Sequence, residues 1–241
     1  KKQMKYFIDV KIQGSNIIEK IFADCMPAPF LSILTNDCIA KGKDYNAGGA
    51  RYNTKYLQGV GIGTITDCLA AVKYNVYDKK NFTMDELMAA LDDNFIGHER
   101  ILNLVKNHSP KYGNDDEYAD EIMKQVFEYY QGEVTGRPNM LGGMYRVNML
   151  PTTCHVYFGE VMMASANGRL AHVPVSEGIS PEKGADVNGP TAVIKSCAKM
   201  DHLMTGGTLL NQKFTPSVVA GEEGLNQMAS LIRSYFNMDG H

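Results

Sequence analysis

The sequence predicts an α/β fold, because segments with helical periodicity alternate with short strand candidates. The clearest helix begins at Thr83, whose hydroxyl can accept the backbone N–H of Glu86 while the Glu86 side chain reaches back to Thr83. Apolar residues then recur every four positions over Leu87–Phe95, which places them on one face of a helix. Tyr145–Met149 alternates weakly between polar and apolar residues, a pattern typical of a strand.

In the first half of the chain we expect mainly helices. Lys1–Phe22 is expected to be helical or mixed, and the helical spacing of Phe30–Ile39 ends near Gly42. The polar, glycine-rich segment Lys43–Gly63 follows, and its length of about twenty residues is unusual for a passive connection. Three more helices are expected, at Ile65–Val76 with Asp67 in its first turn, at Ile101–Val105, and from Ala119 to Tyr130.

The second half of the chain adds strand candidates to the helices. His155–Phe158 and Thr208–Phe214 are predicted as short strands. Pro190 occupies the first position of an expected helix that continues over Thr191–Met204, and Glu222–Tyr235 is the last helix. Glycines and prolines punctuate the long irregular region between these elements.

Composition and charge exclude several classes of protein. With 241 residues, 44% of them apolar and 21% charged, the chain is typical of a globular protein with one large domain or two small ones. Its 24 basic and 27 acidic residues are mixed along the chain and give a net charge of −3. Because no basic block is available to neutralise a phosphate backbone, we expect no nucleic-acid partner.

Membrane insertion and secretion are not expected either. The longest apolar stretches, such as Phe30–Leu34, fall far below the roughly 20 residues that a bilayer requires. The first ten residues lack the apolar core of a signal peptide. The five cysteines are odd in number, widely spaced and without a C-x-x-C pair, which indicates reduced thiols. These observations predict a cytoplasmic protein.

Phosphate and metal binding have only weak support in the sequence. Gly59–Thr64 precedes an expected helix, but its glycine spacing does not fit a dinucleotide fingerprint, and a close-packed structural turn is the favoured interpretation. The six histidines are scattered, and no pair shows the spacing of metal ligands on a helix. We therefore predict no metal-binding and no cofactor-binding residues.

Nucleophilic catalysis is also unsupported. Cys154 and His155 are adjacent, and on the strand predicted there their side chains would point to opposite faces. The polar segment Asn139–Thr153 leaves two interpretations open for Thr152 and Thr153. Their hydroxyls either orient a small polar substrate or bond their own backbone within a turn. No catalytic residue is predicted from these patterns.

Several ordered segments carry a resemblance to a known family. They are YNAGGARYN at Tyr45–Asn53, PKYGNDD at Pro110–Asp116, ASANGRLA at Ala164–Ala171, VSEGISPEKGADVNGPTAVIKS at Val175–Ser196, and GGTLLN at Gly206–Asn211. Together they resemble the glycyl radical enzyme family, the proteins similar to pyruvate formate-lyase, over nearly the whole chain. The resemblance implies an α/β fold that is part of a ten-stranded β/α barrel made of two five-stranded halves. Residues 1–241 would then be a single partial domain, the C-terminal half of such a barrel without the glycyl radical loop.

Neither radical-bearing motif of the family occurs in this sequence. The family carries its thiyl cysteine in a Gly-Cys-Val/Ile-Glu type motif and its radical glycine in an Arg-Val-x-Gly-Tyr type motif, and both strings are missing here. The resemblance therefore implies a fragment of a longer lyase that is inactive by itself. Docking of an activating enzyme or completion of a barrel, without catalysis, is the alternative.

Within the family, Asn148–Gly159 and Gly206–Phe214 most resemble the branch that dehydrates trans-4-hydroxy-L-proline. The resemblance thus implies dehydration of a small polar substrate by the full-length lyase, and the branches that act on choline, glycerol or formate are alternatives. It places Thr152 against the substrate pocket, with Thr153 and His155 as weaker neighbours. The other polar members of the matching segments would be scaffold, namely Asn46, Arg51, Asn53, Arg169 and Asp201.

The resemblance also implies partners that this chain does not contain. An activating enzyme that uses S-adenosylmethionine and an iron–sulfur cluster would install the glycyl radical. The full-length protein would be a homodimer in an anaerobic cytoplasm, because the radical is sensitive to oxygen.

Overall fold

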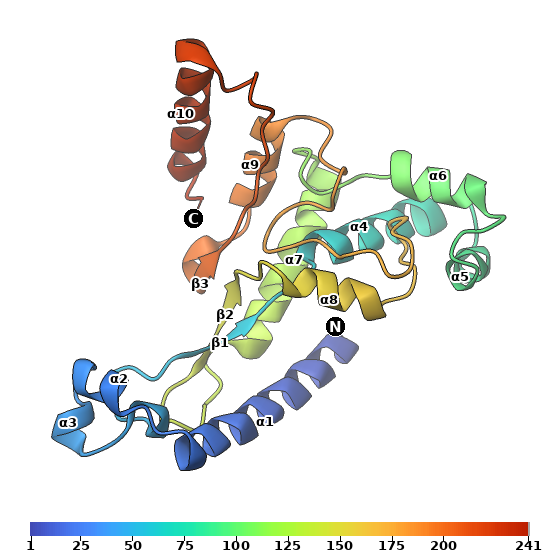
Figure 1. The fold of residues 1–241 in the computed structure, drawn as a ribbon. Helices are drawn as coiled ribbons and strands as arrows, with labels where there is room; N and C mark the ends of the chain where they lie inside the picture. The colour runs from blue at the N-terminus through green and yellow to red at the C-terminus, as the bar shows by residue number, and fades with distance from the viewer. Residues whose placement is uncertain (241) are drawn as a thin grey trace. The chain divides into compact units, whose positions relative to one another are not determined.

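The computed structural model describes residues 1–240, which divide into two compact units (Figure 1). The first unit consists of Lys1–Leu57 and Glu128–Asn148, and the second of Gln58–Phe127 and Met149–His241. Each unit is therefore built from two separate segments of the chain. Within residues 1–240, no helix combines the length and the apolar character needed to cross a membrane.

The first unit contains one long helix, several short ones and two neighbouring strands. Its elements are α1 (Lys2–Cys25), α2 (Pro29–Leu34), α3 (Cys38–Lys41), the 3₁₀ turn η1 (Tyr45–Ala47), β1 (Lys55–Gln58), the end of α7 (Glu117–Val134) and β2 (Tyr145–Met149). β1 and β2 lie side by side in the sheet. The weak alternation at Tyr145–Met149 corresponds to β2, and of the two possibilities for the start of the chain, helical or mixed, the structure has the helix α1.

The helix predicted over Phe30–Ile39 is interrupted in the structure. Thr35 is extended, and Asp37 has a φ of +77°, so the segment forms α2 and α3 instead of one helix. Asp44 stabilises this arrangement, because its carboxylate accepts hydrogen bonds from the Ser32 hydroxyl at 2.7 Å and from the backbone N–H of Ala28 at 2.9 Å. The hydrogen bond from Ser32 lowers the pKa of Asp44.

The second unit contains most of the helices. Its elements are α4 (Ile62–Val72), the π-helical turn η2 (Lys73–Asp78), α5 (Met84–Asp92), α6 (Glu99–Asn107), the start of α7, α8 (Cys154–Val161), α9 (Pro190–Ala198), the 3₁₀ turn η3 (His202–Met204), β3 (Thr205–Thr208) and α10 (Gly221–Asn237). α5 packs beside α6, and α9 packs beside α10 (Figure 1).

The predicted capping box of α5 is present. The backbone N–H of Thr83 donates to Glu86 Oε2 at 2.6 Å, and the backbone N–H of Glu86 donates to Thr83 Oγ1 at 3.2 Å. α5 ends at Asp92, and Phe95 lies beyond it with a φ of +62°. Phe95 nevertheless joins a hydrophobic core cluster of this unit, whose buried members are Ala71, Phe82, Leu87, Ala90, Phe95, Ile101 and Val105.

Three predictions for the second half of the chain are wrong. His155–Phe158 is not a strand, because these residues lie in α8. The aromatic and β-branched residues favour a strand locally, but the helix lets Gly159 pack directly on the backbone of Val173 and Pro174. The helix after Pro190 ends at Ala198, and the strand lies at Thr205–Thr208 rather than at Thr208–Phe214.

Candidate functional site

The candidate substrate residues Thr152 and Thr153 lie in the turn that leads into α8. We call Leu150–Thr153 the Thr152 turn. Both threonines are exposed, whereas Pro151 before them is buried. Thr153 occupies the position before the first helical residue, but its side chain makes no capping hydrogen bond. The structure therefore gives no support to a capping role for the Thr153 hydroxyl.

Two hydrogen bonds hold the chain at the start of the Thr152 turn and at Met149, the residue before it. The N–H of Leu150 donates to Gln58 Oε1 at 3.2 Å, and the N–H of Leu209 donates to Met149 O at 2.9 Å. A Cβ on Gly207 would lie 3.2 Å from the Leu150 side chain, so the segment around β3 closely approaches this turn. The turn is thus fixed at its base while its threonines stay open to the surroundings.

His155 lies in the first turn of α8, and Glu177 faces it from the following loop. Glu177 Oε2 is 4.0 Å from His155 Nδ1. The His155 side chain is only 18% exposed, and its Nδ1 is buried without a hydrogen-bond partner. The backbone N–H of Val175 donates to His155 O at 3.3 Å, which joins the loop to the helix.

Cys154 and His155 do not form a catalytic pair in this structure. Adjacent residues on a helix point in directions about 100° apart, so the two side chains do not face each other. The opposite-face geometry of a strand does not apply here, because both residues lie in α8. All five cysteines are free thiols.

The glycine-rich segment before α4 forms a close-packed structural turn. Gly61 precedes the helix with a φ of +80°, and a Cβ on Gly63 would lie 2.8 Å from Ser180 O. The N–H of Thr64 in the first turn of α4 donates to Ser176 Oγ at 3.1 Å. A side chain of the protein therefore already fills the place where a phosphate oxygen would bind.

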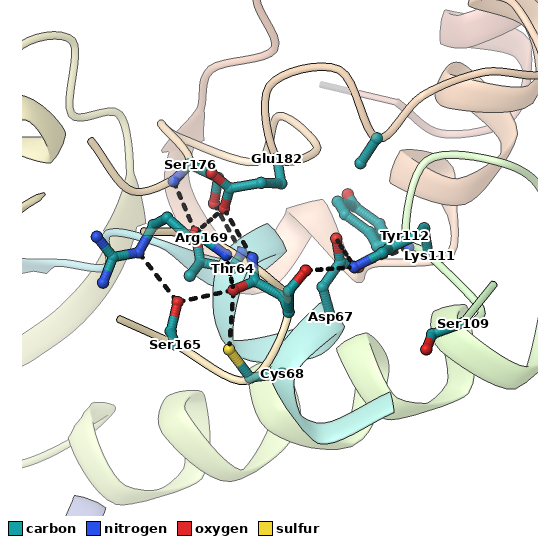
Figure 2. A network of polar contacts seen from close by, with 12 residues as sticks. Thr64, Asp67, Cys68, Ser109, Lys111, Tyr112, Ser165, Arg169, Ser176 and Glu182 are labelled. Carbon is teal, nitrogen blue, oxygen red and sulfur yellow. Dashed lines mark hydrogen bonds and ion pairs between the residues drawn. The ribbon is translucent and has the colours of Figure 1, made fainter. Parts of the chain in front are cut away.

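A network of buried and partly buried polar residues includes two residues of α4 and side chains packed against this helix (Figure 2). We call it the buried polar cluster, and its members are Thr64, Asp67, Lys111, Asn167, Arg169, Ser176 and Glu182. Thr64 and Ser176 bond reciprocally, because the Ser176 N–H also donates to Thr64 Oγ1 at 2.8 Å. The Thr64 hydroxyl donates in turn to Glu182 Oε2. Burial raises the pKa of Glu182, and the hydrogen bond from Thr64 opposes this rise.

Asp67 and Lys111 form the charged centre of the buried polar cluster. Asp67 is completely buried, and Lys111 Nζ lies 3.9 Å from its Oδ2. Asp67 Oδ1 accepts the backbone N–H of Tyr112 at 2.9 Å, while Oδ2 has no hydrogen-bond partner. Burial raises the pKa of Asp67 to about 7, against the opposing effect of Lys111, and burial lowers the pKa of Lys111.

Arg169 joins the buried polar cluster to the loop that follows α8. Its guanidinium is almost fully buried and donates to the carbonyl oxygens of Met163, Leu170 and Val173, the last at 2.6 Å. Its Nε donates to Ser165 Oγ at 3.0 Å. All these acceptors belong to the chain itself, which agrees with the scaffold role expected for Arg169.

Sequence reasoning did not identify the buried polar cluster. Asp67 was noted only as a polar residue in a first helical turn, and Glu182 only as part of a matching segment. The available signal was a charged residue inside an otherwise apolar helix, because Asp67 interrupts the buried face of α4. Within the described range 1–240, including this cluster, no group of three or more His, Cys, Asp or Glu side chains is arranged to hold a metal ion.

Two family models match the chain. The model described as Pyruvate formate lyase-like matches residues 1–159, and the model described as Glycine radical matches residues 175–241. The first match alone covers more than half of the 241 residues, and it includes the Thr152 turn. The second includes Glu177 and Glu182.

The chain is also similar to dehydratases of known sequence. It is 70% identical to the trans-4-hydroxy-L-proline dehydratase of Clostridioides difficile over 241 residues, which are 100% of this chain and 30% of that protein. It is 37% identical to the (2S)-3-sulfopropanediol dehydratase of Klebsiella oxytoca, over 97% of this chain and 29% of that protein. The chain thus spans about 30% of the length of these relatives.

Solved structures show the same relationship. The crystal structure of hydroxyproline dehydratase from Clostridioides difficile with its substrate bound aligns with a TM-score of 0.97 and 69% identity, over 99% of this chain and 30% of that one. The glycerol-bound, B12-independent glycerol dehydratase of Clostridium butyricum aligns with a TM-score of 0.94 and 41% identity, over 99% of this chain and 30% of that one.

Proposed function

Because this chain belongs to the pyruvate formate lyase-like family of glycyl radical enzymes, we propose that it forms part of a dehydratase acting on trans-4-hydroxy-L-proline. The observation that carries this proposal is the 70% identity to a trans-4-hydroxy-L-proline dehydratase over all 241 residues. The family resemblance predicted from the sequence is confirmed, and so is the α/β fold as part of a pyruvate formate-lyase-type barrel.

In the proposed reaction, a thiyl radical removes a hydrogen atom from a substrate that is held at contact distance in a dry pocket. The residues of this chain would bind and orient that substrate. We assign this role to Thr152, whose exposed hydroxyl lies in a turn that is fixed at its base. Thr153 and His155 would line the same pocket beside it. The chain by itself would not turn over substrate, since it carries neither radical motif.

The partners in this proposal lie outside the chain. A radical S-adenosylmethionine activating enzyme would install the glycyl radical, and its iron–sulfur cluster would remain on that partner. The working protein would be a homodimer in an anaerobic cytoplasm. The match to the model described as Glycine radical supports the activating enzyme and the exclusion of oxygen, since a glycyl radical must be generated and protected.

The test uses the full-length protein that contains these residues, activated anaerobically by its activating enzyme. We expect it to dehydrate trans-4-hydroxy-L-proline, and Thr152→Ala to lower kcat/KM by about tenfold to hundredfold, the loss typical of one substrate hydrogen bond. Thr152→Ser keeps the hydroxyl and should retain most activity. Thr54→Ala, a change in the first unit outside the candidate site, is the matched control.

Glycerol is the second substrate to supply, because a glycerol dehydratase aligns over 99% of this chain. If the activated protein converts glycerol but not trans-4-hydroxy-L-proline, it belongs to the glycerol dehydratase branch of the family instead. If the activated protein converts neither compound, and choline and formate also remain unchanged, the dehydratase proposal is wrong and a role in docking or barrel completion takes its place.

A further inference from the structure

We propose that Glu177 is a positioning residue that orients the imidazole of His155, so that His155 accepts a hydrogen bond from the substrate hydroxyl beside Thr152. This inference rests on the proposed function and adds to it a residue, Glu177, together with a direction for the hydrogen bond. The two side chains come from different segments, α8 and the loop that follows it, and lie 4.0 Å apart between Oε2 and Nδ1.

The first argument is the unsatisfied nitrogen of His155. Nδ1 is buried and has no hydrogen-bond partner, which is costly for a polar atom. Glu177 Oε2 is the acidic oxygen that faces it, at a separation slightly longer than a hydrogen bond. The Glu177 side chain is 26% exposed, so it has room to rotate and close this gap.

The second argument is that the backbone around both residues is held in place. The backbone N–H of Val175, which lies two residues before Glu177, donates to His155 O. Ser176, next to Glu177, is bonded in both directions to Thr64 at the start of α4. On the helix side, Gly159 packs against the backbone of Pro174. Because both backbones are anchored, the Glu177 carboxylate stays near the His155 ring.

The third argument is chemical. A neutral imidazole carries one N–H, and a carboxylate next to Nδ1 selects the tautomer with the hydrogen on Nδ1. Nε2 then has a free lone pair and can accept a hydrogen bond. Since Nδ1 is buried, the 18% of the His155 side chain that is exposed belongs to its other atoms. His155 follows the exposed Thr152 and Thr153 by one helical turn or less, so a substrate hydroxyl at the turn can reach it.

A carboxylate that acts through an imidazole has a different signature from a residue that only supports the fold. Loss of Glu177 should weaken substrate binding only while His155 is present. It should leave the folded structure intact, because both side chains are partly exposed, and the one hydrogen bond that Glu177 accepts, from the Ser180 N–H at 2.8 Å, goes to its backbone oxygen, which the substitution keeps. A purely structural role would instead change thermal stability whether or not His155 is present.

The experiment measures binding of trans-4-hydroxy-L-proline to the full-length, unactivated protein by titration calorimetry, so that no radical is needed. Four proteins form a double-mutant cycle, namely wild type, Glu177→Ala, His155→Ala and the double variant. We expect each single variant to raise Kd by about tenfold. The double variant should match His155→Ala within about twofold, because Glu177 acts through His155.

Two further variants and a kinetic readout sharpen the result. Glu177→Gln keeps an oxygen that can accept the Nδ1–H and should restore most of the affinity. Glu160→Gln changes an exposed carboxylate on the same helix and is the matched control, with an unchanged Kd. In the activated enzyme, Glu177→Ala should raise KM while kcat falls less than about threefold, and Tm should shift by no more than about 1 °C.

The outcomes separate this inference from the proposed function. If Thr152→Ala weakens binding but Glu177→Ala does not, the inference is overturned and the substrate site stands. If the effects of Glu177→Ala and His155→Ala multiply in the double variant, Glu177 does not act through His155 and the inference is equally overturned. If wild-type protein does not bind trans-4-hydroxy-L-proline, the proposed substrate is wrong, and the positioning role that rests on it is wrong as well.

Discussion

At the Thr152 turn, two hydroxyl-bearing side chains are exposed and the turn is held only at its base. Around α4, by contrast, the side chains of Thr64, Ser176 and Arg169 are buried and hydrogen-bonded to other parts of the chain. The two regions belong to the same unit of the structure. The two regions are therefore expected to have different roles. Polar groups that already form hydrogen bonds within the protein cannot bind a substrate without first breaking those bonds. We therefore expect the buried polar cluster to control stability and the Thr152 turn to control activity.

The largest expected effect concerns the dependence of stability on pH. The pKa of Asp67 is about 7 in the folded protein, compared with about 3.9 in an unfolded chain. The folded state therefore binds more protons than the unfolded state between these values, and stability falls as the pH rises from about 4 to about 7. This one group contributes a change on the order of 4 kcal/mol, and the raised pKa of Glu182 acts in the same direction.

Urea unfolding at pH 4 and pH 8 checks this prediction. Asp67→Asn should flatten the difference between the two pH values, because the amide does not titrate. Asp92→Asn, at an exposed position, is the control and should preserve the difference. An equally steep pH dependence in Asp67→Asn would show that other groups cause it.

The second effect comes from Arg169. Arg169→Ala removes the guanidinium donor from three backbone carbonyls of the loop after α8, of which only Leu170 O keeps another donor, the Val173 N–H. We expect a loss of about 3 kcal/mol in unfolding free energy. The exposed Arg233→Ala should change it by less than about 0.5 kcal/mol. A small effect of Arg169→Ala would mean that water replaces the guanidinium, and the contrast between the two regions would weaken.

The third effect tests how closely α8 packs on the loop. A Cβ on Gly159 would lie 2.4 Å from Val173 O and from Pro174 Cα, so Gly159→Ala should destabilise the protein by about 2 kcal/mol. At Gly132, inside α7, a Cβ would meet nothing within 4 Å. Gly132→Ala should therefore be neutral or stabilising by up to about 1 kcal/mol. Equal effects at both positions would contradict the packing described here.

The smallest effect on stability is expected at the Thr152 turn. Thr152→Ala and Thr153→Ala should each change the unfolding free energy by less than about 0.5 kcal/mol, since both side chains are exposed. Thermal unfolding measures this, in parallel with the activity assay proposed above. If these variants lose much stability but keep their activity, the Thr152 turn controls stability rather than activity, and the proposed contrast with the buried polar cluster is wrong.

Sequence reasoning succeeded where the information is local. The capping box at Thr83 was predicted correctly, because the residues that form it lie within one helical turn. It failed at His155–Phe158, where strand propensity is outweighed by the contact of Gly159 with a loop some fifteen residues further on. It also missed the cluster around Asp67, since the partners of Asp67 come from distant segments.

By itself, the sequence determined the α/β class, the family and the position of Thr152 in a turn, because these depend on local patterns and on strings of residues that can be matched directly. Only the tertiary structure decided that α8 is a helix, that Ser176 fills the start of α4, and that Glu177 faces His155. The physical reason is that burial and hydrogen bonding between distant segments set the free energy of each arrangement, and neither is visible in the spacing of residues along the chain.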